Sequence, residues 1–143
     1  MKVELNGRVV TYNIARGNLR EQVAKQVGVS ADEITDGLVK YDSEKNLVIV
    51  DNNADKQYAI YAGLHECICC GPYKGMAPKT STPAKRCGLI DRMLIKSMPK
   101  SEREKYIEKR IEMFEALIEY NLNPSLDKQF RESLKALKSV TTK

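Results

Sequence analysis

Two stretches in the first third of the chain alternate between apolar and polar residues, the pattern of half-buried β-strands. The first, "KVELNGRVVTY" at residues 2–12, is interrupted by Asn6-Gly7, the dipeptide that best tolerates the positive φ angles of a type I′ turn. The second places "LVKYD" and "NLVIVDNN" around the polar turn "SEKN" and is rich in β-branched residues. Each pattern predicts a β-hairpin.

The segment between the two hairpins has helical periodicity. Apolar residues recur at helical spacing over residues 19–27, and Gly28 ends the pattern, so we expect a short helix there. Ser30 and Glu33 have the spacing of a capping box, in which the serine oxygen accepts a backbone amide and the glutamate reaches back to the serine amide. This predicts another short helical turn, up to Gly37.

Helical spacing continues through the middle of the chain. Residues 54–70 contain no proline and predict a helix, although Gly63 weakens it by about 1 kcal/mol relative to alanine unless close packing or a ligand compensates. A long loop over residues 71–83 follows. A second helix is expected to begin at Cys87 and to end before Pro99, because a residue that precedes proline disfavours the helical region.

The C-terminal third predicts two more helices. Ser101 and Glu104 form a second capping-box pattern for a long helix through Tyr120, and Ser125 is expected to cap a last helix. The apolar residues expected to face the core of these two helices are Tyr106, Ile107, Ile111, Phe114, Leu117, Ile118, Leu126, Phe130, Leu134 and Leu137.

Together these elements predict an α+β fold, in which a small antiparallel sheet of hairpins packs against a helical bundle containing the "HECIC" helix. We expect a single domain over residues 1–143, with hairpins and short helices in 1–53. Candidate metal-site helices and their loop would occupy 54–99, and the C-terminal helices 100–138.

Composition narrows the class of protein. Of 143 residues, 42% are hydrophobic and 30% are charged, the balance of a soluble globular protein. The N-terminus lacks the apolar region of a signal peptide, and no apolar run approaches the roughly 18 residues of a membrane span, so we expect a cytoplasmic protein without membrane contact. In a reducing compartment, four closely spaced cysteines favour metal binding or redox chemistry over disulfides.

The formal net charge of +5 raises the question of nucleic-acid binding. Lysine and arginine are dense between Lys74 and Arg110, but acidic residues are interleaved with them, and neither aromatic interleaving nor a nucleic-acid-binding motif accompanies them. We therefore expect a solvated basic surface and no direct nucleic-acid binding.

The candidate chemistry lies in "HECICC", residues 65–70. Residues four apart on a helix differ by only about 40° of rotation, which places His65 and Cys69 together. Glu66 lies about 100° further round, where a carboxylate reaches a metal-bound water without coordinating the metal. Cys87 is the obvious third ligand, because a helix N-terminus favours the thiolate form. This nitrogen and sulfur set favours zinc, with an open fourth position and Glu66 as general base.

Several other interpretations of these residues remain open. The cysteines could be small buried hydrophobes around a core histidine, or a closed structural zinc site could combine His65, Cys67, Cys87 and either Cys69 or Cys70. The C-x-x-C spacing of Cys67 and Cys70 also permits redox chemistry. Asp91 could support a ligand or act as one, although an ion pair on the helix surface with neighbours of Arg92 is the favoured role.

In its order of elements the chain resembles the ImmA/IrrE-type family of minimal zinc metallopeptidases. The resemblance is carried by "LREQVAKQVGVSADEI", "NLVIVDNNADKQYAIYAGLHECIC" and "IDRMLIKSMP", over about residues 19–99. It implies a zincin-like fold with an HExxC variant of HExxH, in which His65 binds zinc and Glu66 is the general base. Cys69 falls where the second histidine belongs, and Cys87 lies near the place of the family's acidic third ligand.

The same resemblance implies a substrate class. The strand "LVIVD" would be the sheet edge that aligns a peptide, and the substrate would be a protein such as a helix-turn-helix repressor of a phage or mobile element. Because two thiolates neutralise the zinc charge, a non-catalytic interaction module held together by a structural Cys/His zinc site is the alternative function.

Overall fold

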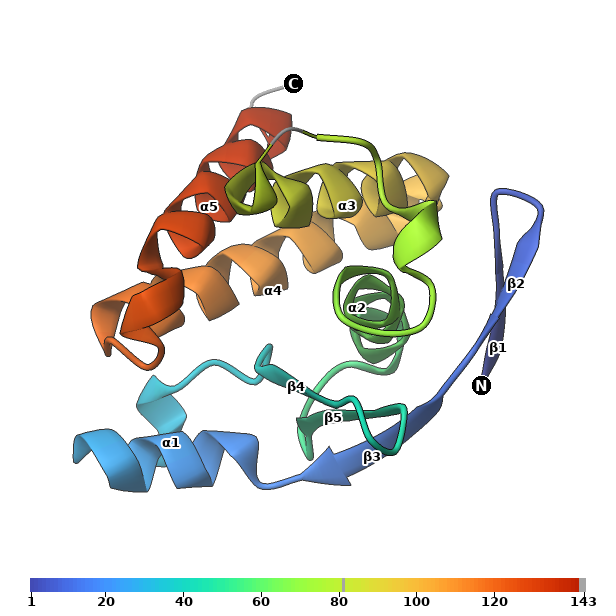
Figure 1. Ribbon diagram of the computed structural model, residues 1–143. Coiled ribbons are helices and arrows are strands. Elements are labelled where there is room, and N and C mark those ends of the chain that lie inside the picture. The colour runs from blue at the N-terminus through green and yellow to red at the C-terminus, as the bar shows by residue number, and fades with distance from the viewer. Residues whose placement is uncertain (81, 142–143) are drawn as a thin grey trace.

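The strands form two small sheets in the computed structural model, which describes residues 1–80 and 82–141 (Figure 1). Strands β1 (Lys2–Leu5) and β2 (Arg8–Thr11) form the antiparallel hairpin that the sequence predicts. Asn6 and Gly7 make its turn with φ angles of 51° and 79°, the positive values that a type I′ turn requires.

The second sheet contains strands in the order β3-β5-β4 and is mixed. Strands β4 (Val39–Asp42) and β5 (Leu47–Asp51) form the expected antiparallel hairpin, and β3 (Asn13–Gly17) adds to the other side of β5 in parallel. The prediction of purely antiparallel hairpins was therefore wrong for this sheet. The prediction that "LVIVD" is an edge was also wrong, because β3 covers it and leaves β4 as an edge strand.

Helix α1 (Leu19–Val27) connects β3 to the hairpin and ends as predicted, with Gly28 in the left-handed conformation at φ 79°. The capping box of Ser30 and Glu33 is confirmed at the start of the short 3₁₀ turn η1 (Ala31–Glu33).

Helix α2 (Lys56–Cys69) begins at the cap residue Asp55, whose carboxylate accepts the backbone amides of Gln57 and Tyr58. Close packing explains the glycine inside this helix. A Cβ atom on Gly63 would lie 2.6 Å from a ring carbon of Tyr12, so the aromatic ring occupies the space that any side chain would need.

The three C-terminal helices lie on the side of α2 away from the three-stranded sheet, and the first two of them pack against α2 (Figure 1). They are α3 (Pro83–Ser97), α4 (Lys100–Glu119) and α5 (Asp127–Thr141), with α5 packed against both others. The loop before α3, of which residue 81 lies outside the described residues, contains the 3₁₀ turn η2 (Lys74–Met76), and η3 (Pro124–Leu126) precedes α5.

The predicted starts of these helices need correction. Helix α3 begins at Pro83 rather than Cys87, since proline is well suited to the first helical position. Pro99 occupies the cap position of α4, which leaves Ser101 inside the helix and without a capping bond. Ser125 lies within η3, where its hydroxyl donates to Asn123, and it does not cap α5.

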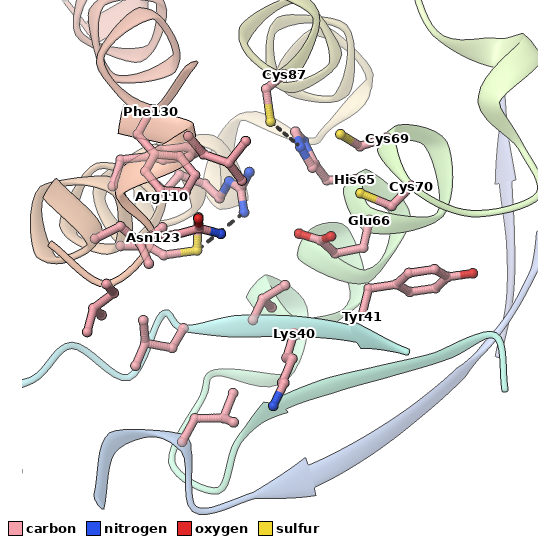
Figure 2. Close-up of a pocket in the computed structure, with 18 of the residues that line it drawn as sticks. Lys40, Tyr41, His65, Glu66, Cys69, Cys70, Cys87, Arg110, Asn123 and Phe130 are labelled. Carbon is pink, nitrogen blue, oxygen red and sulfur yellow. Dashed lines mark hydrogen bonds between the residues drawn. The ribbon is translucent and has the colours of Figure 1, made fainter. Parts of the chain in front are cut away.

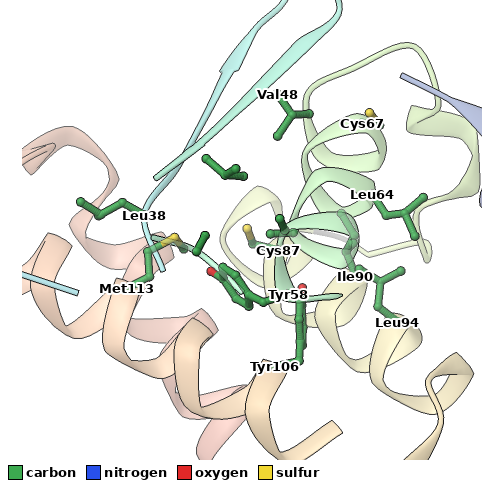
Figure 3. Close-up of a cluster of buried hydrophobic side chains, with 14 of the residues drawn as sticks. Leu38, Val48, Tyr58, Leu64, Cys67, Cys87, Ile90, Leu94, Tyr106 and Met113 are labelled. Atoms are coloured by element: carbon green, nitrogen blue, oxygen red, sulfur yellow. The ribbon is translucent and has the colours of Figure 1, made fainter. Parts of the chain in front are cut away.

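One contiguous apolar core joins the sheets and helices and contains buried residues from Leu5 to Leu137. Figure 3 shows its centre, where Tyr58 and Leu64 of α2 meet Ile90 of α3 and Tyr106 of α4. His65, Asp91 and Arg110 are buried as deeply as these apolar side chains. Among the described residues, no helix is both long and apolar enough to span a membrane.

Candidate metal centre

The structure brings together the three side chains that the sequence predicts as metal ligands. His65 and Cys69 project from successive turns of α2 toward Cys87 of α3 (Figure 2). Their ligand atoms all lie within 4.8 Å of one another, and His65 Nε2 lies 3.1 Å from Cys87 Sγ. In a tetrahedral site with bonds of about 2.0–2.3 Å, ligand atoms lie roughly 3.3–3.8 Å apart, so these atoms could hold a metal ion after small side-chain adjustments.

Asp91 orients the histidine from the opposite side. This fully buried carboxylate lies 2.8 Å from His65 Nδ1, accepts the Tyr106 hydroxyl at 2.5 Å, and accepts Arg110 Nε at 3.2 Å. A hydrogen bond from Nδ1–H to Asp91 fixes the tautomer that leaves Nε2 free to bind a metal.

The role favoured for Asp91, an ion pair on the helix surface, was therefore wrong. A spacing signal existed, because Asp91 follows Cys87 by four residues on α3, and Tyr106 and Arg110 are four apart on α4. The sequence does not reveal that these two helix faces meet around a histidine of a third helix.

The buried charges strongly shift the ionisation of the cluster in the metal-free chain. Burial by itself lowers the pKa of His65, but Asp91 and Cys87 outweigh it and raise that pKa to about 10. Arg110 and His65 lower the pKa of Asp91 to about 2, against the opposing effect of burial. The side chain of Cys69 and then His65 lower the pKa of Cys87 well below its ordinary value, although burial acts the other way.

These shifts favour an imidazolium at His65 and a thiolate at Cys87 in the metal-free chain. The Cys87 thiolate is therefore stabilised by something other than the helix N-terminus that the sequence predicted. Cys87 lies more than one turn after Pro83, beyond the first turn in which the helix dipole acts most strongly. Its partners on α2 stabilise the thiolate instead.

Glu66 is half-buried beside the cluster, and its carboxylate points into the adjoining cleft (Figure 2). Burial raises its pKa, while His65 and Arg110 act in the opposite direction. A carboxylate with a raised pKa, next to a position where a metal would hold water, is suited to accept a proton.

The other two cysteines lie outside the three-residue cluster. Cys67 is fully buried in the apolar core (Figure 3), where burial raises its pKa to about 12. Cys70 is exposed at the end of α2, and the neighbouring side chain of Cys69 lowers its pKa, although burial acts the other way. The structure therefore separates this C-x-x-C pair into a core residue and a surface residue.

The cluster lines one end of a cleft with a volume of about 480 Å³. Residues 38–41, which contain most of β4, form one wall, and side chains of α1, α4, α5 and the connection between α4 and α5 form the walls away from the cluster. Lys40 and Tyr41 of β4 lie near Glu66 in Figure 2. This edge strand lines the site, where the sequence had assigned the role to "LVIVD".

Compared with models of protein families, with curated proteins and with solved structures, the chain matches none of them. Membership in the ImmA/IrrE-type family therefore stays a prediction.

Proposed function

We propose that the protein is a zinc-dependent peptidase with zinc bound by His65, Cys69 and Cys87. The observation that carries the proposal is the meeting of these three ligand atoms beside the Glu66 carboxylate, at the end of one cleft. One histidine nitrogen and two thiolates suit zinc, which takes mixed nitrogen and sulfur ligands, better than magnesium or calcium, which take oxygen.

Three protein ligands leave one tetrahedral position for water or substrate, as catalytic zinc sites require. Zinc would supply a water of lowered pKa and polarise the substrate carbonyl. Glu66 would accept the proton of the attacking water and pass it to the leaving amine. Asp91 would keep Nε2 of His65 directed at the metal throughout, since it is held by Tyr106 and Arg110.

Strand β4 is the proposed site of substrate alignment. An edge strand has backbone amides and carbonyls without a neighbouring strand, and an extended peptide can pair with them. Because residues 38–41 line the same cleft as Glu66, a peptide paired there would pass the metal. The substrate would be a protein or peptide, for which the family resemblance suggests a helix-turn-helix repressor.

One observation favours the second candidate function, a non-catalytic zinc-held interaction module. Cys70 follows Cys69 directly and lines the same cleft, so a rotation of this exposed thiol could supply a fourth ligand and close the site. A closed site would hold α2 and α3 together without room for water.

The two candidates are separated by metal content and turnover. Elemental mass spectrometry on protein purified without added metal or a histidine tag should find about one zinc per chain. Cys69→Ser and Cys87→Ser should lose it, whereas Cys67→Ser and Cys70→Ser should retain it. Well-folded protein without metal would refute both functions, and loss of zinc in Cys70→Ser would favour the closed site.

Catalysis needs a separate measurement. Zinc-loaded protein incubated with fluorescently labelled casein should release peptides, and Glu66→Gln should abolish the release while its zinc content stays the same. Equal release by wild type and Glu66→Gln would contradict the role of Glu66.

A further inference from the structure

The cleft continues past the candidate metal centre into an apolar chamber. Its walls combine side chains from α1, α4, α5 and the connections between elements. The apolar chamber is the space lined by Val23, Leu38, Phe114, Leu117, Leu126 and Phe130. Leu126 is 37% exposed, and Val23 and Leu117 are half-buried, so part of this apolar surface faces the cleft rather than the packed core.

The six residues that define the chamber carry no charge. Among the described residues that line the whole cleft, Glu66 is the only acidic one, and it lies at the metal end. Arg110 is already paired with Asp91, and Lys40 is exposed on β4. A charged side chain that entered the chamber would lose its hydration without compensation.

Size and position point to the occupant. A volume of about 480 Å³ for the whole cleft lies within the range of roughly 300–1,000 Å³ for small-ligand sites. Side chains of an extended peptide alternate between its two faces. A peptide paired with β4, with its carbonyl at the metal, would therefore direct one neighbouring side chain toward the helices that form the chamber.

We propose that the apolar chamber is a specificity pocket for a bulky apolar side chain, of the leucine or phenylalanine type, on the residue next to the bond that is cleaved. This inference rests on the proposed peptidase function and adds the substrate class. Leu117 of α4 and Leu126 of η3 would be the residues that determine specificity.

Zinc-binding hydroxamic acids test the chamber without a known substrate. Calorimetric titration of zinc-loaded full-length protein would compare acetohydroxamic acid with hydrocinnamohydroxamic acid, which adds a phenyl group, and with succinic monohydroxamic acid, which adds a carboxylate. Burial of a phenyl group should make the second ligand bind about 10- to 100-fold more tightly than the first. The carboxylate should give no such gain.

Matched variants test whether the tighter binding of the hydrocinnamic compound comes from the chamber. Leu126→Asp and Leu117→Asp should remove most of the ratio between the affinities for the hydrocinnamic and acetic compounds. Val9→Asp adds the same charge at a residue of β2 that is 54% exposed and should keep the ratio. Zinc content of each variant reports its folding, and the more exposed Leu126 keeps the test available if Leu117→Asp does not fold.

The outcomes distinguish failure of the chamber from failure of the metal site. Equal affinities for the hydrocinnamic and acetic compounds in zinc-loaded protein would overturn the proposed role of the chamber as a specificity pocket and leave the metal site unaffected. Absence of zinc, or zinc without any hydroxamate binding, would overturn the peptidase and the chamber together. Much tighter binding of octanohydroxamic acid would assign the chamber to a long acyl chain and overturn the peptide side chain as its occupant.

Discussion

Replacement of Asp91 by asparagine tests the buried network beneath the candidate metal centre. The two side chains have nearly the same shape, but asparagine has no charge and presents an NH₂ group in place of one oxygen. Both carboxylate oxygens of Asp91 accept hydrogen bonds, from His65 and Tyr106 on one side and from Arg110 on the other. The NH₂ group would face a donor in either orientation.

The expected loss of stability follows from burial and charge. The pKa of Asp91 falls from 3.8 to about 2, which corresponds to about 2–3 kcal/mol of stabilisation of the folded chain. Arg110 is only 1% exposed, and an unpaired buried charge of this kind typically costs about 3–5 kcal/mol. We therefore expect Asp91→Asn to lower the free energy of unfolding by about 2–5 kcal/mol.

Asp91→Asn should also affect zinc affinity. A hydrogen-bond partner of a metal-binding histidine typically contributes about 10- to 100-fold in metal affinity. Asp91→Asn should weaken zinc binding by a factor in this range, because His65 loses the acceptor that fixes its tautomer.

Urea denaturation in the presence of a chelator measures the first effect, and competition with a zinc-binding dye measures the second. Asp127→Asn is the matched control, because it removes an exposed ion pair with Arg131. It should cost about 1 kcal/mol or less and should leave zinc affinity unchanged. A cost below about 1 kcal/mol for Asp91→Asn, with unaltered zinc affinity, would refute the orienting role.

Three further predictions concern acid, packing and metal competition. The metal-free chain should lose the stability that Asp91 contributes as pH falls from about 4 to about 2, because the pKa of Asp91 is lower in the folded than in the unfolded chain. Acid titration followed by circular dichroism measures this loss of stability, and Asp91→Asn should not show it. Gly63→Ala should cost about 1–3 kcal/mol in urea denaturation, since its Cβ would lie 2.6 Å from the Tyr12 ring, whereas Gly75→Ala has open space and should cost less. Zinc affinity should decrease about tenfold for each unit by which the pH is lowered and for each proton displaced, because zinc must displace the proton that His65 holds below its pKa of about 10. A zinc dissociation constant that does not change with pH would contradict this.

The parts of the fold that the sequence predicted well are those determined by residues close in the chain. Asn6-Gly7 specifies its own hairpin, and the spacing of His65 and Cys69 follows from helix geometry alone. The start of α3 was also readable, because Pro83 favours a first helical position, but the prediction gave more weight to Cys87.

The errors come from contacts between distant segments. β3 is a five-residue strand that ends at Gly17, and its partner β5 begins thirty residues later. No local sequence pattern predicts this parallel pairing. Once β3 was missed, β5 was taken for an edge, and the strand that lines the cleft was misidentified. Asp91 was assigned to the surface for the same reason, since only tertiary packing brings α4 over it.

The energetics of the Asp91 network bear on why it exists. Removing one partner of a buried ion pair is costly, but replacing the whole pair with apolar side chains of similar volume is often neutral or stabilising. An apolar core around α2, α3 and α4 would therefore serve stability at least as well as Asp91 and Arg110 do. Apolar residues could not hold the Nδ1 proton of His65 and keep Nε2 directed at Cys87. The network is thus better explained by the orientation of the histidine of the candidate metal centre than by folding, and a doubly apolar variant should fold while binding zinc poorly.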